Sequence, residues 1–340
     1  MALGLSLTMA TALLAGCGST NDTSADAGSA GDSGDTSAEQ VVIYSNADEE
    51  AITAMENALD SNGYEGQYVF QTFGTSELGG RMMAEGSKIE ADLVTMSTYY
   101  LDTAQKESEM FSDLSFDHTT LSGDCPSYSS PITAQEGAVM VNTEVMREQG
   151  LSAPASVKDL ADPKYAGQVS IPDIEGSSTG WILVQAVIDA YGETEGAEIM
   201  TGIIRNAGPH MESSGSGPFK KVKAGEVALA FGLRHQAVAA KKEGLPIDYI
   251  DPSEGSYALT ESIVVINKGD KTNAKAMEMA ECIVKSARTE LLKTYPLPLY
   301  PGETADPALC TKNPNSFPEP LSVDLLLKHL EFSEKCKLNK

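Results

Sequence analysis

The chain has 340 residues and a formal net charge of −25, with 24 Lys and Arg against 49 Asp and Glu. This acidic balance argues against a nucleic-acid partner, because phosphate backbones recruit Lys and Arg in excess. After the first segment, no apolar run reaches the roughly 18 residues that a membrane-spanning helix requires. The body of the chain is therefore expected to lie outside the bilayer.

Residues 1–16 are predicted to form a secretory signal peptide. The run from Met1 to Leu14 is apolar, and the sequence Leu-Ala-Gly-Cys follows, ending at Cys17. This ending resembles the lipobox of bacterial lipoproteins, in which the cysteine becomes the lipidated N-terminus. An ordinary signal peptide with a cysteine near its cleavage site is the alternative. Residues 17–39 lack large apolar side chains and are predicted to be a lipidated flexible tether.

From residue 40 onward, short β-rich runs alternate with helical patterns. Strands are expected at residues 41–44, 68–70, 91–96, 138–141, 169–171, 227–231 and 263–266. Helices are expected at residues 46–62, 74–86, 143–149, from 177 onward, around 218 and at 273–285. The first helix is expected to be capped by Asn46, with Glu49 three residues later. This alternation predicts an α/β fold with a mainly parallel sheet covered by helices.

Four cysteines follow Cys17, and they show no metal-binding spacing. Cys125, Cys282, Cys310 and Cys336 form no Cys-x-x-Cys motif and have no histidine pattern nearby, so neither a metal site nor a cofactor is expected. Outside the cytoplasm they can form two disulfides in three alternative pairings. A bridge between Cys310 and Cys336, which would pin the C-terminal segment, is one possibility.

Several segments together resemble the family 1 extracellular solute-binding proteins, in the branch of ferric-ion and 2-aminoethylphosphonate binders. The most specific is Asp159-Leu-Ala-Asp-Pro-Lys-Tyr-Ala-Gly167, within the longer match 156–169. The others are residues 91–94, 223–229, 265–269 and 295–298. The resemblance covers about residues 40–305.

The resemblance implies a two-lobed type II periplasmic-binding-protein fold with a hinge between the lobes. Lobe one would comprise residues 40–133 and 262–340, and lobe two residues 134–261. Residues 134–137 and 259–262 would form the hinge. The implied partners are the permease and ATPase of an ABC importer. The protein would be a monomer outside the cytoplasm, held at the membrane by its lipid anchor alone.

The loops that follow the expected strands are rich in Ser, Thr and Gly where helices begin. Backbone N–H groups at helix N-termini favour anions, so these loops predict an oxyanion site; ordinary helix capping is the alternative reading of each. The candidate ligand-binding residues are Ser45, Asn46, Thr75, Ser76, Thr98, Tyr99, Ser177, Ser178, Thr179, Ser214, Ser216, Gly217, Arg234, His235 and Glu261.

Four of these predictions are more specific. The two glycines of residues 213–217 would permit unusual backbone angles around an anion. Arg234 would supply a guanidinium for a phosphonate or phosphate group. His235 would either contact the ligand or pack. The ammonium group of an aminophosphonate would be met by Glu261 or Glu254, with Tyr99 or Tyr257 as possible cation–π partners.

The leading hypothesis is therefore a binding protein for 2-aminoethylphosphonate or a similar small organophosphorus anion. The alternative within the same family is a ferric-ion or ferric-complex binder. The resemblance places two adjacent ligand tyrosines in the loop after the strand at 227–231, and this chain has Leu233-Arg-His-Gln236 there. An enzyme such as a secreted hydrolase is not expected, because the chain has no Gly-x-Ser-x-Gly or His-Glu-x-x-His motif.

Overall fold

The computed structural model describes residues 40–123 and 125–340. The predicted signal peptide, the tether and Cys17 lie outside the described residues. Within the described part of the chain, no helix is long and apolar enough to cross a membrane.

The strands form one mixed sheet with the order β2-β1-β3-β9-β4-β7-β5-β6; β8 also pairs with β4, and β10 pairs with β9. The strands are β1 (Val41–Ser45), β2 (Tyr68–Thr72), β3 (Leu93–Ser97), β4 (Ser129–Asn142), β5 (Val169–Pro172), β6 (Met211–Glu212), β7 (Leu229–Leu233), β8 (Ile247–Ile250), β9 (Ser256–Val265) and β10 (Pro314–Asn315). The strands β1, β2 and β3 pair in parallel, as do β5, β6 and β7. The predicted parallel α/β arrangement is therefore present in two groups of strands.

The helices cover these strands. They are α1 (Glu49–Ser61), α2 (Thr75–Glu85), α3 (Thr98–Ser108), α4 (Thr143–Gln149), α5 (Ser178–Ala207), α6 (Gly217–Lys223), α7 (Arg234–Lys242), α8 (Ala274–Cys282), α9 (Arg288–Thr294) and α10 (Val323–Leu338). The five-residue π-helix η5 (Ile283–Ala287) joins α8 to α9. Short 3-10 turns occur at Gly86–Lys88, Lys158–Ala161, Pro163–Tyr165 and Gly269–Lys271.

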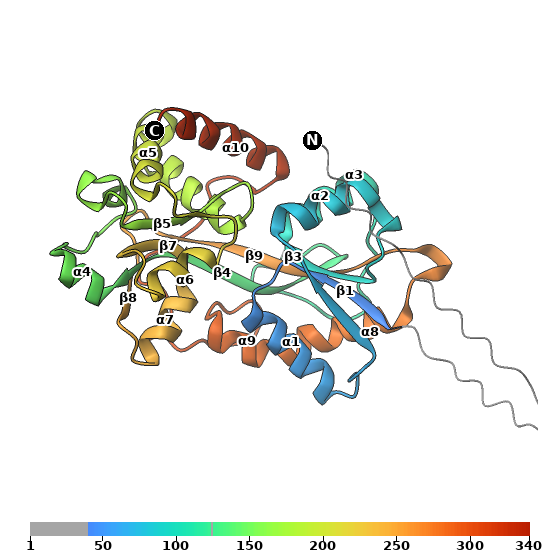
Figure 1. Cartoon of the computed structure of the whole chain (residues 1–340). Coiled ribbons are helices and arrows are strands. Elements are labelled where there is room, and N and C mark those ends of the chain that lie inside the picture. Colours follow the sequence, from blue (N-terminus) through green and yellow to red (C-terminus); the bar gives the residue numbers. More distant parts are fainter. Residues whose placement is uncertain (1–39, 124) are drawn as a thin grey trace, which may run out of the picture. The chain divides into compact units, whose positions relative to one another are not determined.

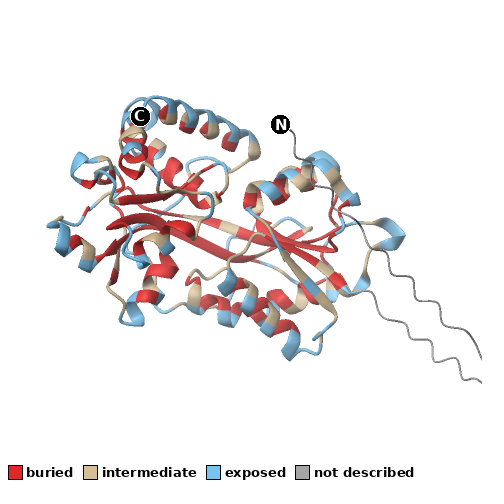
Figure 2. Cartoon of the chain, viewed as in Figure 1, coloured by how far each residue is buried: buried red, intermediate tan, exposed pale blue. Residues whose placement is uncertain are grey.

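The long antiparallel strands β4 and β9 link the two parallel groups (Figure 1). The first half of β4 pairs with β9, and residues 137–141 then pair with β7. At its other end, β9 pairs with β3. The predicted hinge residues, 134–137 and 259–262, thus lie where these strands pass from one group to the other. Both strands are buried along most of their length (Figure 2).

Apolar side chains form buried clusters on both faces of the sheet. Met55 and Leu59, on the predicted stripe of α1, pack with strand residues such as Ile43 and with α8 and η5. A larger cluster surrounds α5, whose Trp181 is fully buried, and continues into the first group through Tyr44 and Val94. The apolar core is therefore continuous between the two groups of strands.

The C-terminal helix α10 packs against α5. Trp181 Nε1 donates a hydrogen bond to Nδ1 of His329, 2.8 Å away, and Lys337 pairs with Asp173 at 2.9 Å. Residues 262–340 were expected in lobe one, but α5 belongs to the range expected in lobe two. The chain therefore passes between the groups a third time after β9, and α10 buries its apolar face on the second group.

All four described cysteines are free thiols. Cys310 Sγ lies 3.4 Å from the carbonyl oxygen of Pro296, whereas Cys336 Sγ lies 3.7 Å from that of Ala197, on α5. The possible bridge between Cys310 and Cys336 is therefore absent, because the two thiols are packed against different parts of the fold.

Candidate ligand-binding site

A pocket of about 240 Å³ opens where the two groups of strands meet. The predicted site residues that line it are Asn46, Thr75, Ser177, Ser178, Thr179, Ser214, Ser216 and Glu261. Asp48 and Gln135 complete its polar lining, and Phe73 and Leu233 contribute apolar surface. We call this cavity the hydroxyl pocket, because six of the predicted residues carry hydroxyl groups.

Helix starts supply the hydroxyl side of this pocket. The helix α2 begins after Gly74, which provides no side-chain capping bond, so its first-turn N–H groups have no side-chain partner at that end. Ser177 caps α5 by accepting a hydrogen bond from the Thr179 N–H at 3.2 Å. Ser178 makes no hydrogen bond through its hydroxyl among the described residues, so this group is available to a ligand.

The loop at residues 213–217 lies directly against the start of α5. A Cβ atom on Gly215 would lie 2.4 Å from Thr179 Oγ1, and one on Gly176 would lie 2.4 Å from the Ser213 carbonyl oxygen. Gly215 and Gly217 do not have positive φ angles, so the predicted unusual backbone angles are absent. Gly215 instead permits close approach, which holds Ser214 and Ser216 beside Ser177 and Thr179 in the pocket wall.

Glu261 is one of the two carboxyl side chains in the pocket lining. The residue is only 3% exposed, and its Oε2 accepts hydrogen bonds from Gln135 Nε2 at 3.2 Å and Thr133 Oγ1 at 3.4 Å. Burial, and then the negative charge of Asp48, raise the pKa of Glu261 to about 8. Its carboxyl group is therefore largely neutral at pH 7 in the empty pocket.

Asp48 is the pocket residue that the sequence prediction missed. It caps α1, which was expected to be capped by Asn46: its Oδ1 accepts from the Ala51 N–H at 3.2 Å and from the Tyr295 hydroxyl. Its Oδ2 lies 3.3 Å from His235 Nε2. Burial raises the pKa of Asp48, but the hydrogen bonds and charge of His235 and the other donors outweigh it and leave the pKa lowered. An Asp directly before the apolar stripe is itself an N-cap signal and could have identified this residue.

Arg234, which was predicted to bind the ligand, is paired within the protein in this structure. Its guanidinium Nε donates to Asp251 Oδ1 at 2.7 Å, and its terminal nitrogens donate to the carbonyl oxygens of Leu309 and Cys310. The side chains of Arg234 and Asp251 are 3% and 7% exposed. Arg234 lines a separate pocket with Lys293 and does not line the hydroxyl pocket. It attaches the chain after α9 to the second group of strands.

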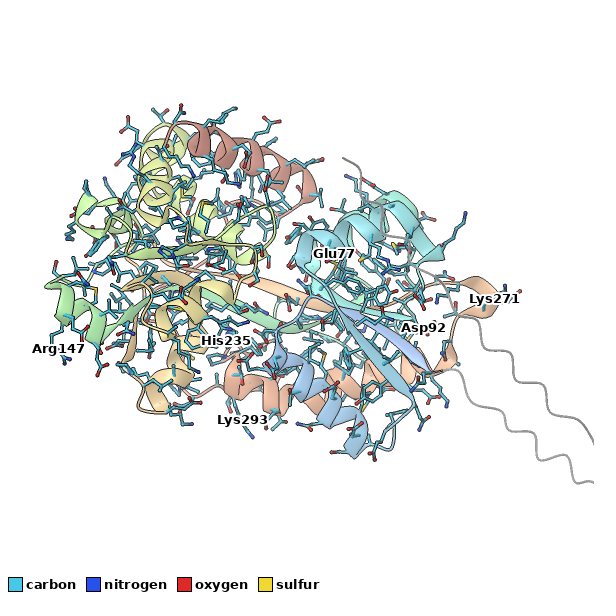
Figure 3. The ribbon with its side chains drawn as sticks, in the orientation of Figure 1. Glu77, Asp92, Arg147, His235, Lys271 and Lys293 are labelled. Atoms are coloured by element: carbon cyan, nitrogen blue, oxygen red, sulfur yellow. The ribbon has the colours of Figure 1, made fainter. Side chains whose placement is uncertain are left out.

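His235 lies in the first turn of α7 (Figure 3). Its side chain packs inside the protein and does not line the hydroxyl pocket. Its ring lies 4.6 Å from the ring of Tyr295, and its Nε2 faces Asp48. It therefore acts on the pocket through Asp48.

The remaining predicted residues lie in the surrounding structure. Ser45 is fully buried and accepts a hydrogen bond from Thr95, and Gly217 packs against Glu212. Thr98 bonds to the Thr260 carbonyl and lines another cavity. Ser76 donates to the carbonyl oxygen of Glu175, and Tyr99 packs on Trp181 with ring centroids 4.7 Å apart.

The other candidates for the ammonium group are also occupied. The Glu254 carboxylate accepts from the N–H groups of Val157 and Lys158 and from the Tyr191 hydroxyl. The Tyr257 hydroxyl donates to Asp189. These groups stabilise the second group of strands and lie outside the hydroxyl pocket.

The described residues contain one group whose side chains could together hold a metal ion, formed by Asp48, Glu50 and His235, with ligand atoms within 4.8 Å of one another. Glu50 is exposed, and Asp48 Oδ1 already accepts two hydrogen bonds. The adjacent tyrosines Tyr99 and Tyr100 are buried, and burial raises the pKa of both phenols. Neither Tyr99 nor Tyr100 lines the hydroxyl pocket.

The fold is that of the periplasmic binding proteins. A substrate-binding protein of an ABC transporter from Agrobacterium tumefaciens has a TM-score of 0.73 and 16% identity, with 90% of this chain and 96% of that chain covered. Fructose-6-phosphate-bound AfuA from Actinobacillus pleuropneumoniae has a TM-score of 0.69 and 17% identity, with 89% of this chain and 98% of that chain covered. Iron-bound HitA from Pseudomonas aeruginosa has a TM-score of 0.66 and 18% identity, with 88% of this chain and 99% of that chain covered.

The family of bacterial extracellular solute-binding proteins matches residues 95–320. The chain belongs to this family, which confirms the predicted family, the extracytoplasmic location and the expectation of a binding protein rather than an enzyme. An uncharacterized protein of Haemophilus influenzae is 28% identical over 117 residues, a match that spans 34% of this chain and 34% of that relative.

Proposed function

We propose that this solute-binding protein is the capture subunit of an ABC importer and that it binds a small organophosphorus anion, such as 2-aminoethylphosphonate, in the hydroxyl pocket. The observation that carries the proposal is the convergence of the starts of α2 and α5 and the loop before α6 on one cavity lined by hydroxyl groups.

An anion in this pocket would be held by dipoles rather than by a fixed positive charge. Within the described chain, no Lys, Arg or His lines the hydroxyl pocket. First-turn N–H groups carry a partial positive charge, and hydroxyl groups can donate to several oxygens of a tetrahedral head group. Hydrogen bonds to a charged group contribute about 1.5–3 kcal/mol each, so several of them suffice for micromolar binding.

The bound ligand of AfuA, fructose-6-phosphate, is itself a phosphate ester, and this supports an organophosphorus ligand for this chain. The iron of HitA supports the alternative ferric ligand. The adjacent tyrosines Tyr99 and Tyr100 lie outside the hydroxyl pocket, and Oδ1 of Asp48 already accepts two hydrogen bonds, which favours the first of these two ligands.

The remaining parts of the proposal concern the assembly. We propose that Cys17 is lipidated, that residues 17–39 tether the folded body to the membrane, and that the body acts as a monomer on its permease and ATPase. Residues 134–137 and 259–262 would serve as the hinge between lobes, because β4 and β9 pass there between the two groups of strands.

Calorimetric titration tests the ligand. 2-Aminoethylphosphonate is expected to bind, and Ser178→Ala is expected to weaken it about tenfold, because this hydroxyl lines the pocket without an internal hydrogen bond. Ser213→Ala is the matched control, since this serine is exposed and lies outside the pocket lining. Binding of ferric citrate with no response to any organophosphorus compound would reject the proposal.

A further inference from the structure

A second cavity of about 240 Å³ lies on the opposite face of β4 from the hydroxyl pocket. Neighbouring residues of a strand point to opposite faces of its sheet. Gln135 lines the hydroxyl pocket, whereas Ala134 and Glu136 line the second cavity. No described residue lines both cavities. We call the second cavity the hinge pocket, because residues 134–137 belong to the predicted hinge.

Both groups of strands contribute walls to the hinge pocket. On the second group, α7 supplies Val238, Ala239 and Lys242. On the first group, Lys293 lies at the end of α9, and Pro296 follows this helix. The helices α7 and α9 lie next to one another (Figure 1). A molecule bound between them would therefore contact both groups beside the strand that joins them.

The lining of the hinge pocket includes a buried carboxyl group without a partner. Glu136 is only 6% exposed, and its carboxyl group makes no hydrogen bond or ion pair with another described residue. Arg234 lines the same cavity, but its guanidinium donates to Asp251 and to two backbone carbonyl groups. A buried polar group without a partner is costly, so Glu136 can accept a hydrogen bond from a bound molecule.

Two lysines bring positive charge to the same cavity. Lys242 is exposed and makes no ion pair within the described part of the chain. Lys293 pairs with Glu290 on its own helix, and both of these side chains are more than half exposed. Such exposed pairs contribute little to stability, so Lys293 can exchange Glu290 for another anion. Because Asp251 balances Arg234, the two lysines outweigh Glu136, and the lining favours an anion.

We propose that the hinge pocket is a second ligand site, which binds a small hydroxycarboxylate. The carboxylate would pair with Lys242 and Lys293, and the hydroxyl group would donate a hydrogen bond to Glu136. A hydroxyl group suits this place because a second carboxylate beside Glu136 would be repelled. Val238 and Leu309 would cover the carbon chain. The site is separate from solute capture, and it does not depend on which solute the hydroxyl pocket binds.

The size of the hinge pocket limits the ligand. An engineered cavity of roughly 150 Å³ holds benzene, so the hinge pocket has room for a molecule with about four carbon atoms. Malate has this size and carries a hydroxyl group between two carboxylates. Succinate is the matched compound, since it keeps both carboxylates and the carbon chain but has no hydroxyl group.

Calorimetric titration of the full chain with racemic malate at low salt tests the site. Malate is expected to bind once per chain, and succinate about tenfold more weakly, because it cannot donate to Glu136. Added salt should weaken malate binding, since solvent reaches both lysines. Glu136→Leu should bring the two affinities together. The comparison of malate with succinate needs only the wild-type protein, so it remains decisive if this variant does not fold.

Lysine variants test whether the anion contacts both groups of strands. Lys242→Gln and Lys293→Gln should each weaken malate binding at least threefold, because each removes one of the two positive charges. Lys241→Gln is the matched control: it removes the same charge from the same helix, but Lys241 pairs with Asp248 and does not line the hinge pocket.

Three results would overturn the proposal. The first is an absence of saturable malate binding. The second is equal affinity for malate and succinate, which would remove Glu136 from the site. The third is malate binding that Ser178→Ala weakens and the variants of Lys242 and Lys293 do not, because malate would then occupy the hydroxyl pocket.

Discussion

Replacement of Arg234 is expected to reduce stability rather than ligand affinity. Arg234→Met keeps much of the side-chain volume but removes a guanidinium that is almost fully buried with Asp251. Loss of one partner of a buried ion pair costs about 3–5 kcal/mol, because the remaining charge stays buried. Asp251 retains the Lys312 N–H at 2.9 Å, so the lower end of this range, about 3 kcal/mol, is expected.

Urea denaturation of the wild-type and variant proteins measures this loss, and Asp251→Asn with the double variant completes a mutant cycle. The double variant should be more stable than the sum of the single losses predicts, since it leaves no unpaired charge. Burial raises the pKa of Asp251, but Arg234 and the other donors outweigh it and leave the pKa lowered. The wild-type pair therefore contributes stability above the unfolded pKa and loses it as pH falls through the folded pKa. The difference in unfolding free energy between Arg234→Met and the wild type should therefore become smaller at acidic pH.

Ligand titration of the same variant gives the refuting result. Arg234→Met should change the affinity for 2-aminoethylphosphonate by less than threefold, because the guanidinium does not line the hydroxyl pocket. A stability loss below about 1 kcal/mol together with a tenfold loss of affinity would show that the guanidinium binds ligand, contrary to this reasoning.

Three further predictions follow from the pocket and the thiols. Gly215→Ala should lower stability by about 1–3 kcal/mol and weaken ligand binding, because the added methyl group would clash with Thr179 Oγ1. Thermal melts measure the stability and calorimetry measures the affinity. A variant with unchanged stability and affinity would contradict the close packing of Gly215 on Thr179. Without ligand, the difference in unfolding free energy between wild type and Glu261→Gln should shrink by about 1.4 kcal/mol per pH unit from pH 5 to 8, because the raised pKa of Glu261 favours the native state at pH values below that pKa. A difference that stays constant with pH in urea melts would refute the raised pKa of Glu261. Alkylation after unfolding, read by mass spectrometry, should label both Cys310 and Cys336 without prior reduction, whereas a reducible cross-link between them would contradict the structure.

Local sequence patterns were sufficient for most elements of the fold. The strand at 169–171 was predicted close to the bounds of β5, and the short helix expected around Pro218 is α6, because turn residues and apolar periodicity mark these elements. The length of β4 was underestimated: only 138–141 form a continuous apolar run, whereas residues 129–137 are strand because they pair with β9. Pairing between distant segments leaves no periodic signal in one strand alone.

The position of polar residues along the chain indicated which of them line the pocket. The partners of their side chains could not be predicted in the same way. Ser178, which follows β5, lines the hydroxyl pocket, and so does Glu261, which lies within β9 and was chosen for its place at the predicted hinge. Arg234 also follows a strand, yet Asp251 and the carbonyl groups at 309 and 310 take its guanidinium. Those partners lie far along the chain, so neither spacing nor residue type could reveal that this charge is already satisfied.

The environment of Trp181 has a practical consequence. It is the chain's single tryptophan, and its indole contacts Tyr99 of α3 and His329 of α10, so elements from three distant stretches of sequence meet around one fluorophore. Its emission therefore comes from a single known position beside the start of α5, the helix that also lines the hydroxyl pocket. Solute titrations can be followed by intrinsic fluorescence without attaching a dye.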